Sequence, residues 1–233
     1  MLYKIKKNQC INQYTIIKKL GEGRFGKCFL VVNEFGEKRV IKKIKKSFFG
    51  KIKGDKIESV ILSRLKHTKI PNFFEIIENP KFYGYVIEFI EGDNLEKLIF
   101  KEKRKFSKKE FFIIGKQLIE IIEYLHINNI VHRDIRLPNL ILNKDMLFLI
   151  DFGLARVIDN IKYVAQIDFT YLGDVFLYIL YTDYDNSSTN KAWYNELDLS
   201  HSQNFFLKKL MGIEVPYNNI KEVYNDFIEA FDI

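Results

Sequence analysis

The first hundred residues follow the alternating apolar and polar pattern of β-strands. Short runs rich in β-branched and aromatic residues are separated by turn residues, and they predict strands over Tyr14–Leu20, Lys27–Val32, Glu37–Ile44, Phe73–Ile77 and Phe82–Phe89. The turn sequence at 33–36 joins the second strand to the third as a hairpin. One segment in this region, Asp55–Lys66, has helical spacing instead, with an apolar face made of Ile57, Val60, Ile61 and Leu65.

Helical periodicity dominates the rest of the chain. Ser107 followed by Glu110 forms a capping box, which predicts a helix from there to about Ile127. Its apolar positions should face a core: Phe111, Ile114, Leu118, Ile121, Ile122 and Leu125. Further helices are expected over Asn94–Phe100, Tyr171–Tyr181, Ser202–Met211 and Lys221–Phe231, and short strands over Leu140–Leu142 and Leu147–Ile150. The pattern predicts an α+β protein whose strand-rich domain spans 1–90 and whose helical domain spans 91–233.

Composition and charge limit the classes of protein to which this chain could belong. With 233 residues and 47% hydrophobic content, the chain can bury a sizeable core, yet no apolar run reaches the length of a membrane span. The N-terminus lacks an apolar leader segment, and two cysteines are too few for a disulfide framework, so we expect a cytoplasmic location. The net charge is +7, and residues 1–56 hold 16 Lys/Arg against 4 Asp/Glu. Without a nucleic-acid motif, this basic quarter favours a solvated surface.

A glycine-rich loop, Gly21–Gly26, lies between the first two predicted strands. Glycine lets a backbone pass close to phosphate groups, although a plain glycine-rich hairpin would have the same pattern. A dinucleotide-binding loop would need a helix directly after it, and here a strand follows. Lys42 on the third strand could contact nucleotide phosphates, and Glu58 in the following helix could pair with its ammonium.

Two polar motifs in the helical half supply hard oxygen ligands and a candidate base. His132-Arg133-Asp134 is followed by Asn139, and Asp151-Phe152-Gly153 follows an apolar strand. Taken singly, Asp134 and Asp151 could be turn residues and Asn139 a loop residue. With the glycine loop, Lys42 and Glu58, they stand in the order of the protein-kinase signature.

On these motifs the chain resembles the Hanks-type serine/threonine protein kinases from about Tyr14 to Leu180, and more weakly small bacterial kinase-like proteins. The resemblance implies a bilobal fold. Its first lobe would be an antiparallel sheet plus one helix, and its second would be mainly helical, with a shortened activation segment and C-terminal end. It also implies transfer of the ATP γ-phosphate, with Mg²⁺ or Mn²⁺, to a hydroxyl, favouring Ser or Thr of a protein.

The resemblance also implies a role for individual residues. Asp134 would act on the attacking hydroxyl, Arg136 would replace the usual lysine, Lys42 and Glu58 would orient phosphates, and Asn139 and Asp151 would hold metal ions. The nucleotide-binding residues that it implies are Leu20, Gly21, Glu22, Gly23, Gly26, Cys28, Val40, Lys42, Glu88, Ile90 and Leu142. We expect Lys42 and the metal ligands to converge on one triphosphate.

The segment after Gly153 departs from the family pattern. The Ala-Pro-Glu motif is absent, and the hydroxyl-bearing residues before Asp174 are Tyr163, Thr170 and Tyr171. We therefore expect that phosphorylation of this segment is not required. Asp174 is expected to be the buried helix aspartate that accepts N–H groups of the catalytic loop.

Three alternatives stay open. Loss of the usual acceptor platform would suit a small-molecule or lipopolysaccharide-type kinase. A pseudokinase would bind nucleotide as an interaction module without turnover. A nucleic-acid-binding protein would use basic residues such as Lys4, Lys6, Lys7, Lys45 and Lys46. The sequence indicates neither the acceptor, the pathway nor the oligomeric state.

Overall fold

The computed structural model describes residues 7–45, 56–79, 82–184 and 191–232. Contacts between residues divide the chain into two compact units, Met1–Ile90 and Glu91–Ile233. Among residues named above, Lys4, Lys6, Lys46 and Asp55 lie outside the described part of the chain.

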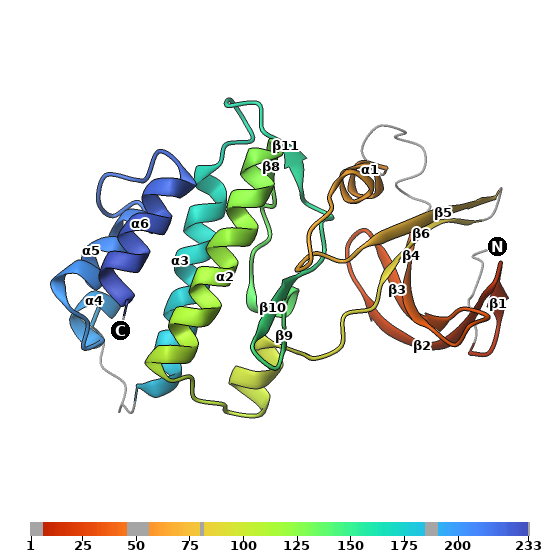
Figure 1. Cartoon of the computed structure of the whole chain (residues 1–233), viewed down its shortest axis with the longest axis horizontal. Coiled ribbons are helices and arrows are strands. Elements are labelled where there is room, and N and C mark those ends of the chain that lie inside the picture. The colour runs from red at the N-terminus through yellow and green to blue at the C-terminus, as the bar shows by residue number, and fades with distance from the viewer. Residues whose placement is uncertain (1–6, 46–55, 80–81, 185–190, 233) are drawn as a thin grey trace. The chain divides into compact units, whose positions relative to one another are not determined.

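The first unit is built on a six-stranded antiparallel sheet with strand order β1-β2-β3-β4-β6-β5 (Figure 1). Its strands are β1 Cys10–Ile11, β2 Tyr14–Glu22, β3 Gly26–Val32, β4 Lys38–Ile44, β5 Phe73–Asn79 and β6 Phe82–Glu88. All five predicted strands are present, and β1 is an addition of two residues. The hairpin turn is confirmed, because the Gly36 N–H donates to the Asn33 carbonyl at 3.0 Å and Gly36 has φ +79°.

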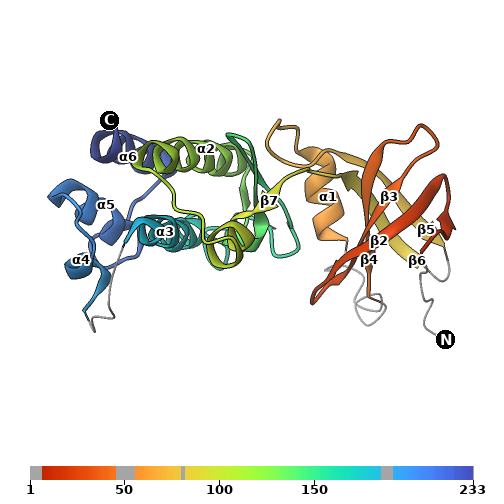
Figure 2. The same cartoon turned by 90° about the horizontal axis from the view of Figure 1, so that it is seen from below.

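The two faces of this sheet differ. One face carries a closed apolar cluster made of Ile11, Tyr14, Ile16, Phe29, Val31, Ile41, Ile77, Phe82 and Val86. Side chains alternate along a strand, so Cys28, Val40 and Lys42 lie on the other face. The helix α1, Ile57–Arg64, contacts β5 and lies beside the sheet (Figure 2). Val60 was expected in its apolar face, but its side chain is exposed because it lies on the outer side of the helix.

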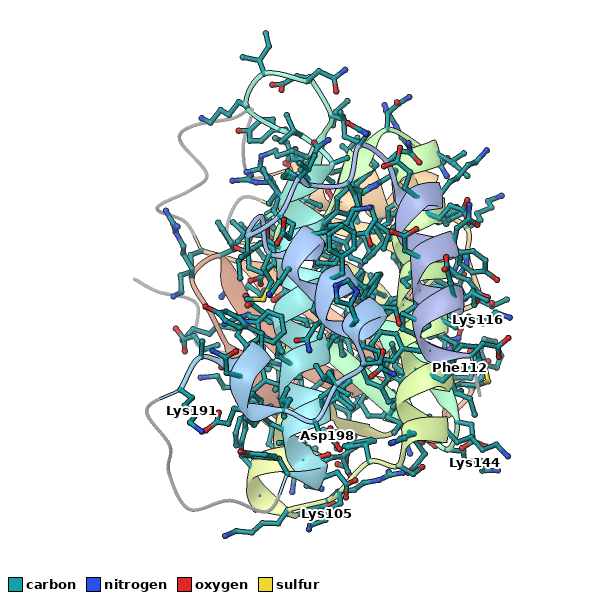
Figure 3. All side chains as sticks on the ribbon, turned by 90° about the vertical axis from the view of Figure 1, so that its left-hand side faces the viewer. Lys105, Phe112, Lys116, Lys144, Lys191 and Asp198 are labelled. Atoms are coloured by element: carbon teal, nitrogen blue, oxygen red, sulfur yellow. The ribbon has the colours of Figure 1, made fainter. Side chains whose placement is uncertain are left out.

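The second unit is formed around the long helix α2, Lys108–Ile127, which contacts α3 and α6. The other helices are α3 Gln166–Leu180, α4 Trp193–Glu196, α5 His201–Leu210 and α6 Ile220–Phe231. Aromatic rings fill the space between them, with Phe111 at 4.9 Å from Phe231 and 5.2 Å from Phe176 between ring centroids. Charged side chains such as Lys105 and Lys191 lie at the periphery (Figure 3).

The capping box of α2 is confirmed: the Ser107 hydroxyl accepts from the Glu110 N–H, and the Glu110 carboxylate accepts from the Ser107 N–H. All six apolar positions predicted for this helix are buried. The start of α3 was predicted at Tyr171, which is wrong, because the helix begins at Gln166. Asp168 interrupted the apolar pattern, yet its side chain is fully buried in the same helix.

Short elements complete the second unit. Strands β7 Asp93–Asn94, β9 Leu140–Asn143 and β10 Met146–Leu149 form a sheet of order β10-β9-β7. Strand β8 Ile130–Val131 pairs with β11 Arg156–Val157. A π-helical turn covers Lys97–Lys101, and 3₁₀ turns cover Leu137–Asn139 and Tyr181–Asp183. Two-residue strands have no periodicity, so β7, β8 and β11 could not be predicted from the pattern.

The sheet with one helix, followed by a mainly helical unit, is the α+β architecture that the sequence predicted. Within the described ranges, no helix combines the length and hydropathy needed to cross a bilayer.

Candidate active site

One row of residues crosses the sheet of the first unit and brings several predicted site residues together. Gly21 pairs with Cys28, Cys28 pairs with Lys42, and these three positions therefore share one face. Val40 lies two residues from Lys42 and faces the same side. The register of β2, β3 and β4 therefore places the glycine loop beside the lysine.

Lys42 and Glu58 form a buried ion pair. The ammonium donates to both carboxylate oxygens of Glu58, at 2.7 and 2.8 Å, and the two side chains are only 7% and 6% exposed. Glu58 lies in the first turn of α1, where a negative charge is favoured by the helix dipole. The pair fixes the ammonium on the sheet face that also carries Cys28 and Val40.

The glycine loop closes on itself as a hairpin. The Gly23 N–H donates to the Gly26 carbonyl at 2.9 Å. A Cβ at Gly26 would lie 2.3 Å from the Lys43 carbonyl oxygen, so the pairing of β3 with β4 requires glycine there. A Cβ at Gly21 or Gly23 would meet no atom within 4 Å. The protein's own packing therefore does not require these two glycines, although the Gly23 N–H and carbonyl are both already bonded, the carbonyl to the Lys45 ammonium at 2.8 Å.

Glu22 in this loop is engaged by lysines. Its carboxylate lies 2.8 Å from the Lys19 ammonium, 3.1 Å from Lys27 and 3.5 Å from Lys45. Hydrogen bonds from Lys19 and then Lys27 lower the pKa of Glu22 to about 2. The Glu22 side chain thus serves the loop's own structure, and its backbone is the part that could face a nucleotide.

The remaining predicted nucleotide contacts have different surroundings. Leu20 is 42% exposed at the end of β2, whereas Ile90 is buried. The Glu88 N–H donates to the Asn72 carbonyl, and its carboxylate accepts from the Asn72 amide, so both groups are already in use. In the second unit, Leu142 is buried in β9, where it pairs with Asp93 and Leu147.

Asp134 is the centre of a polar group in the second unit. The Asn139 amide donates to the Asp134 carboxylate at 2.8 Å and to its carbonyl at 2.9 Å. Arg136 forms an ion pair with the other carboxylate oxygen at 3.1 Å, and the arginine side chain is 59% exposed. Since the Asn139 NH2 group is directed to Asp134, the side-chain oxygen of Asn139 is the atom that could bind a metal ion.

Asp151 follows β10 and has φ +65°, a left-handed conformation that is strained for a residue with a Cβ. Its carboxylate accepts from the Gly153 N–H at 3.3 Å. Among the described residues, no group of three or more His, Cys, Asp or Glu side chains could hold a metal. Mg²⁺ does not need three such side chains, because it commonly completes its shell with water and substrate phosphates. The Asn139 amide oxygen and the Asp151 carboxylate are therefore a suitable pair of ligands for it.

The loop that carries Asp134 is held by Asp168, which the sequence analysis missed. Its carboxylate is fully buried and accepts from the His132 N–H at 2.9 Å and the Arg133 N–H at 2.8 Å. His126 of α2 contacts the same carboxylate through Nε2 at 3.0 Å. Asp174 was expected in this role, which is wrong, because it lies on the exposed side of α3. His132 is itself fully buried, which lowers its pKa, and packs edge-on to Phe152 at 4.7 Å.

Comparison with known proteins shows which family the chain belongs to. Residues 14–184 match the model of the protein kinase domain. The chain belongs to the protein kinase family. It is similar to the probable serine/threonine-protein kinase YbdM of Bacillus subtilis, with 36% identity over 231 residues that cover 94% of this chain and 90% of that protein.

Other relatives share a smaller part. The kinase is 33% identical over 157 residues to a probable casein kinase I homolog of Encephalitozoon cuniculi, covering 64% of this chain and 50% of that protein. It is 34% identical over 174 residues to the serine/threonine-protein kinase KIN4 of Saccharomyces cerevisiae, covering 67% of this chain and 21% of that protein. Because it covers 94% of this chain, the match to YbdM extends beyond residue 184.

Because α3 begins at Gln166, the segment that follows Phe152 in this kinase is shorter than the sequence predicted. Thr170 and Tyr171, counted above as residues of that segment, lie inside α3. Between Leu154 and Ala165, Tyr163 is the one hydroxyl-bearing side chain. A helix pattern that tolerated one buried aspartate would have found the correct start of α3.

Proposed function

We propose that this kinase transfers the γ-phosphate of ATP, with Mg²⁺, to a Ser or Thr hydroxyl of a protein. The observation that carries the proposal is the Asp134 carboxylate, which Asn139 fixes at 2.8 Å while the surrounding loop is bonded to the buried Asp168. A fixed carboxylate beside a metal-ligating amide is what phosphoryl transfer needs, because that reaction depends on positioning and charge neutralisation.

Each unit contributes one set of residues in this proposal. Residues 1–90 bind the nucleotide: the glycine loop lies against its phosphates, where Gly21 and Gly23 leave space because they carry no side chain, and the Lys42 ammonium, fixed by Glu58, neutralises their charge. Cys28, Val40 and Ile90 supply apolar surface for the base. Residues 91–233 bind the acceptor and metal.

The acceptor hydroxyl is oriented by Asp134, which takes its proton as the new bond to phosphorus forms and the bond from phosphorus to the leaving ADP oxygen breaks. Arg136 pairs with Asp134 through an exposed guanidinium, which can turn to the transferred phosphate and bind it with two N–H groups. Asn139 and Asp151 would hold Mg²⁺, which supplies charge neutralisation at the phosphates. The serine/threonine kinases among the relatives support a protein hydroxyl as the acceptor.

The test compares the wild-type protein with Asp134→Asn, using labelled ATP, a pool of proteins and a panel of small metabolites. We expect label on Ser or Thr of proteins, and a loss of roughly 10²- to 10⁴-fold in the variant because the proton acceptor is gone. The matched control is Asp174→Asn, which removes an exposed carboxylate from α3 and should retain activity.

Two results would contradict the proposal. Label found only in small molecules would point to a small-molecule kinase. Binding of Mg·ATP with turnover no greater than that of Asp134→Asn would point to a pseudokinase.

A further inference from the structure

The segment that follows Phe152 is anchored by backbone pairing to residues 129–131, directly before the loop that carries Asp134. Arg156 pairs with Val131 and Val157 with Ile130, where β11 meets β8. The Ile158 N–H then donates to the Asn129 carbonyl at 2.8 Å. These bonds fix the first half of the segment 154–165 and direct the following residues along the same loop.

Beyond β11 the chain makes a tight turn around Asp159. One carboxylate oxygen, Oδ1, accepts from the N–H groups of Ile161, Lys162 and Tyr163, at 2.9, 2.8 and 2.8 Å. The Asp159 N–H donates to the Tyr163 carbonyl at 3.1 Å, which closes the turn. These N–H groups, that of Tyr163 first, lower the pKa of Asp159. The turn sets the position of Tyr163.

The Tyr163 ring lies against the guanidinium of Arg133. The Arg133 Cζ atom is 4.6 Å from the ring centroid, and its Nη1 donates to the Leu154 carbonyl at 3.2 Å. Among the residues that the structure describes, no carboxylate forms an ion pair with this guanidinium. A cation over an aromatic face is attracted by the ring, and more strongly when partly desolvated. Arg133 is thus held by two uncharged groups of one segment.

The backbone at Arg133 is strained. Its φ is +67°, a region that non-glycine residues seldom adopt, and its N–H is bonded to Asp168. Such a conformation persists only where the surroundings determine it from more than one side. Asp168 holds the backbone, and Tyr163 and Leu154 hold the head of the side chain. The residue that follows is Asp134, so the same contacts constrain the backbone from which its carboxylate extends.

We propose that Tyr163 is a positioning residue which acts through Arg133 to hold the loop that carries Asp134. The inference rests on the proposed function. A neutral ring gives the guanidinium a partner that needs no covalent modification. The kinase therefore turns over without a phosphate on the segment 154–165, in which Tyr163 is the one hydroxyl-bearing residue.

The first test compares Tyr163→Ala, which removes the ring, with Tyr163→Phe, which retains it. The matched control is Tyr194→Ala, which removes another ring from a cation, the Lys208 ammonium at 4.5 Å. Intact mass first verifies that each preparation is unphosphorylated. We expect kcat of Tyr163→Ala to fall about five- to tenfold with KM for ATP unchanged, whereas the ring-retaining variant and the control keep most of the activity.

Arg133→Ala shows whether the effect passes through the arginine. In that background, Tyr163→Ala should cause no further loss of kcat, because the contact is already gone. The inference is overturned if Tyr163→Ala has the same kcat as the wild type. It is also overturned if Tyr163→Ala lowers kcat by the same factor in the Arg133→Ala background as in the wild type.

Limited trypsin cleavage gives a readout independent of activity. Lys162 is exposed in the Asp159 turn, and release of the ring should speed cleavage after it. Tyr163 is also the residue after the cleaved bond, so Arg133→Ala, which leaves that bond unchanged, is the deciding variant. It should be cut faster there than the wild type and Tyr194→Ala, and equal rates would overturn the inference. An inactive wild-type protein would reject the proposed function, while this cleavage comparison would still decide the role of Tyr163.

Discussion

The two units fix their charged residues in different ways. In the first, one side chain holds another: the Lys42 ammonium contacts both carboxylate oxygens of Glu58, and both are buried. In the second, the buried Asp168 carboxylate holds the backbone of the loop, through the N–H groups of His132 and Arg133. One arrangement orients a single ammonium, and the other shapes a whole segment.

The difference shows what each arrangement tolerates. An ion pair depends on two side chains, so changing both together can restore a balanced charge. Backbone N–H groups bound to a carboxylate cannot be removed by a second mutation. These donors remain whatever residue replaces the aspartate. The stability lost on replacing Lys42 should therefore be recovered when Glu58 is replaced as well. The stability lost on replacing Asp168 should not be recovered by a second substitution.

The largest expected effect is on the first unit. Lys42→Met leaves the Glu58 carboxylate buried without its cation, and the free energy of unfolding should fall by about 3–5 kcal/mol. Adding Glu58→Gln should restore most of that loss, although not the activity. Denaturant titration measures both. The control is Lys56→Met, which breaks an exposed pair with Glu78 and should change stability by less than about 1 kcal/mol. An equal loss of unfolding free energy in the single and double variants would show that the unpaired Glu58 carboxylate is not the cause of the destabilisation.

The next effect concerns the backbone-holding carboxylate. Asp168→Asn presents an amide where the carboxylate accepted two N–H groups, and we expect a loss of about 3 kcal/mol because a buried charged acceptor is removed. The same substitution at Asp174, on the exposed side of α3, should stay within about 0.5 kcal/mol. Urea unfolding of both variants is the measurement. Equal losses at the two positions would mean that Asp168 does not hold the loop.

The smallest effect is a pH dependence confined to the second unit. Burial lowers the pKa of His132 below its ordinary value near 6.5, so the unfolded chain takes up a proton there more readily than the folded chain. Stability from this group is therefore complete above about pH 6.5 and declines as the pH falls from there toward the folded-state pKa. Unfolding measured at several pH values should have a shallower slope in His132→Phe than in the wild type. Identical slopes would contradict this assignment.

Local patterns were enough for much of the architecture. The capping box at Ser107 and Glu110 needs only four consecutive residues, and the structure forms it as expected. The β3–β4 hairpin follows from alternation and the turn at Asn33. The family followed from five motifs in order, and the match over 14–184 confirms it.

The errors have one physical cause, which is contact between residues far apart in the sequence. Asp168 was passed over because a charged residue in an apolar helix pattern looks like a boundary, and only the partners His126, His132 and Arg133 explain its burial. Asp174 was chosen because it resembled the buried helix aspartate of the kinase family. The strands β8 and β11 were missed because their pairing joins residues 130–131 to residues 156–157.

The sequence by itself determined which elements form and which chemistry the chain carries, because periodicity, caps and motifs are properties of near neighbours. Only the tertiary structure decided which aspartate supports the loop, that Glu22 is bound by lysines, and that the Tyr163 ring covers Arg133. These contacts join residues distant along the chain or set by a turn, and their energy comes from burial and geometry that the order of residues does not display.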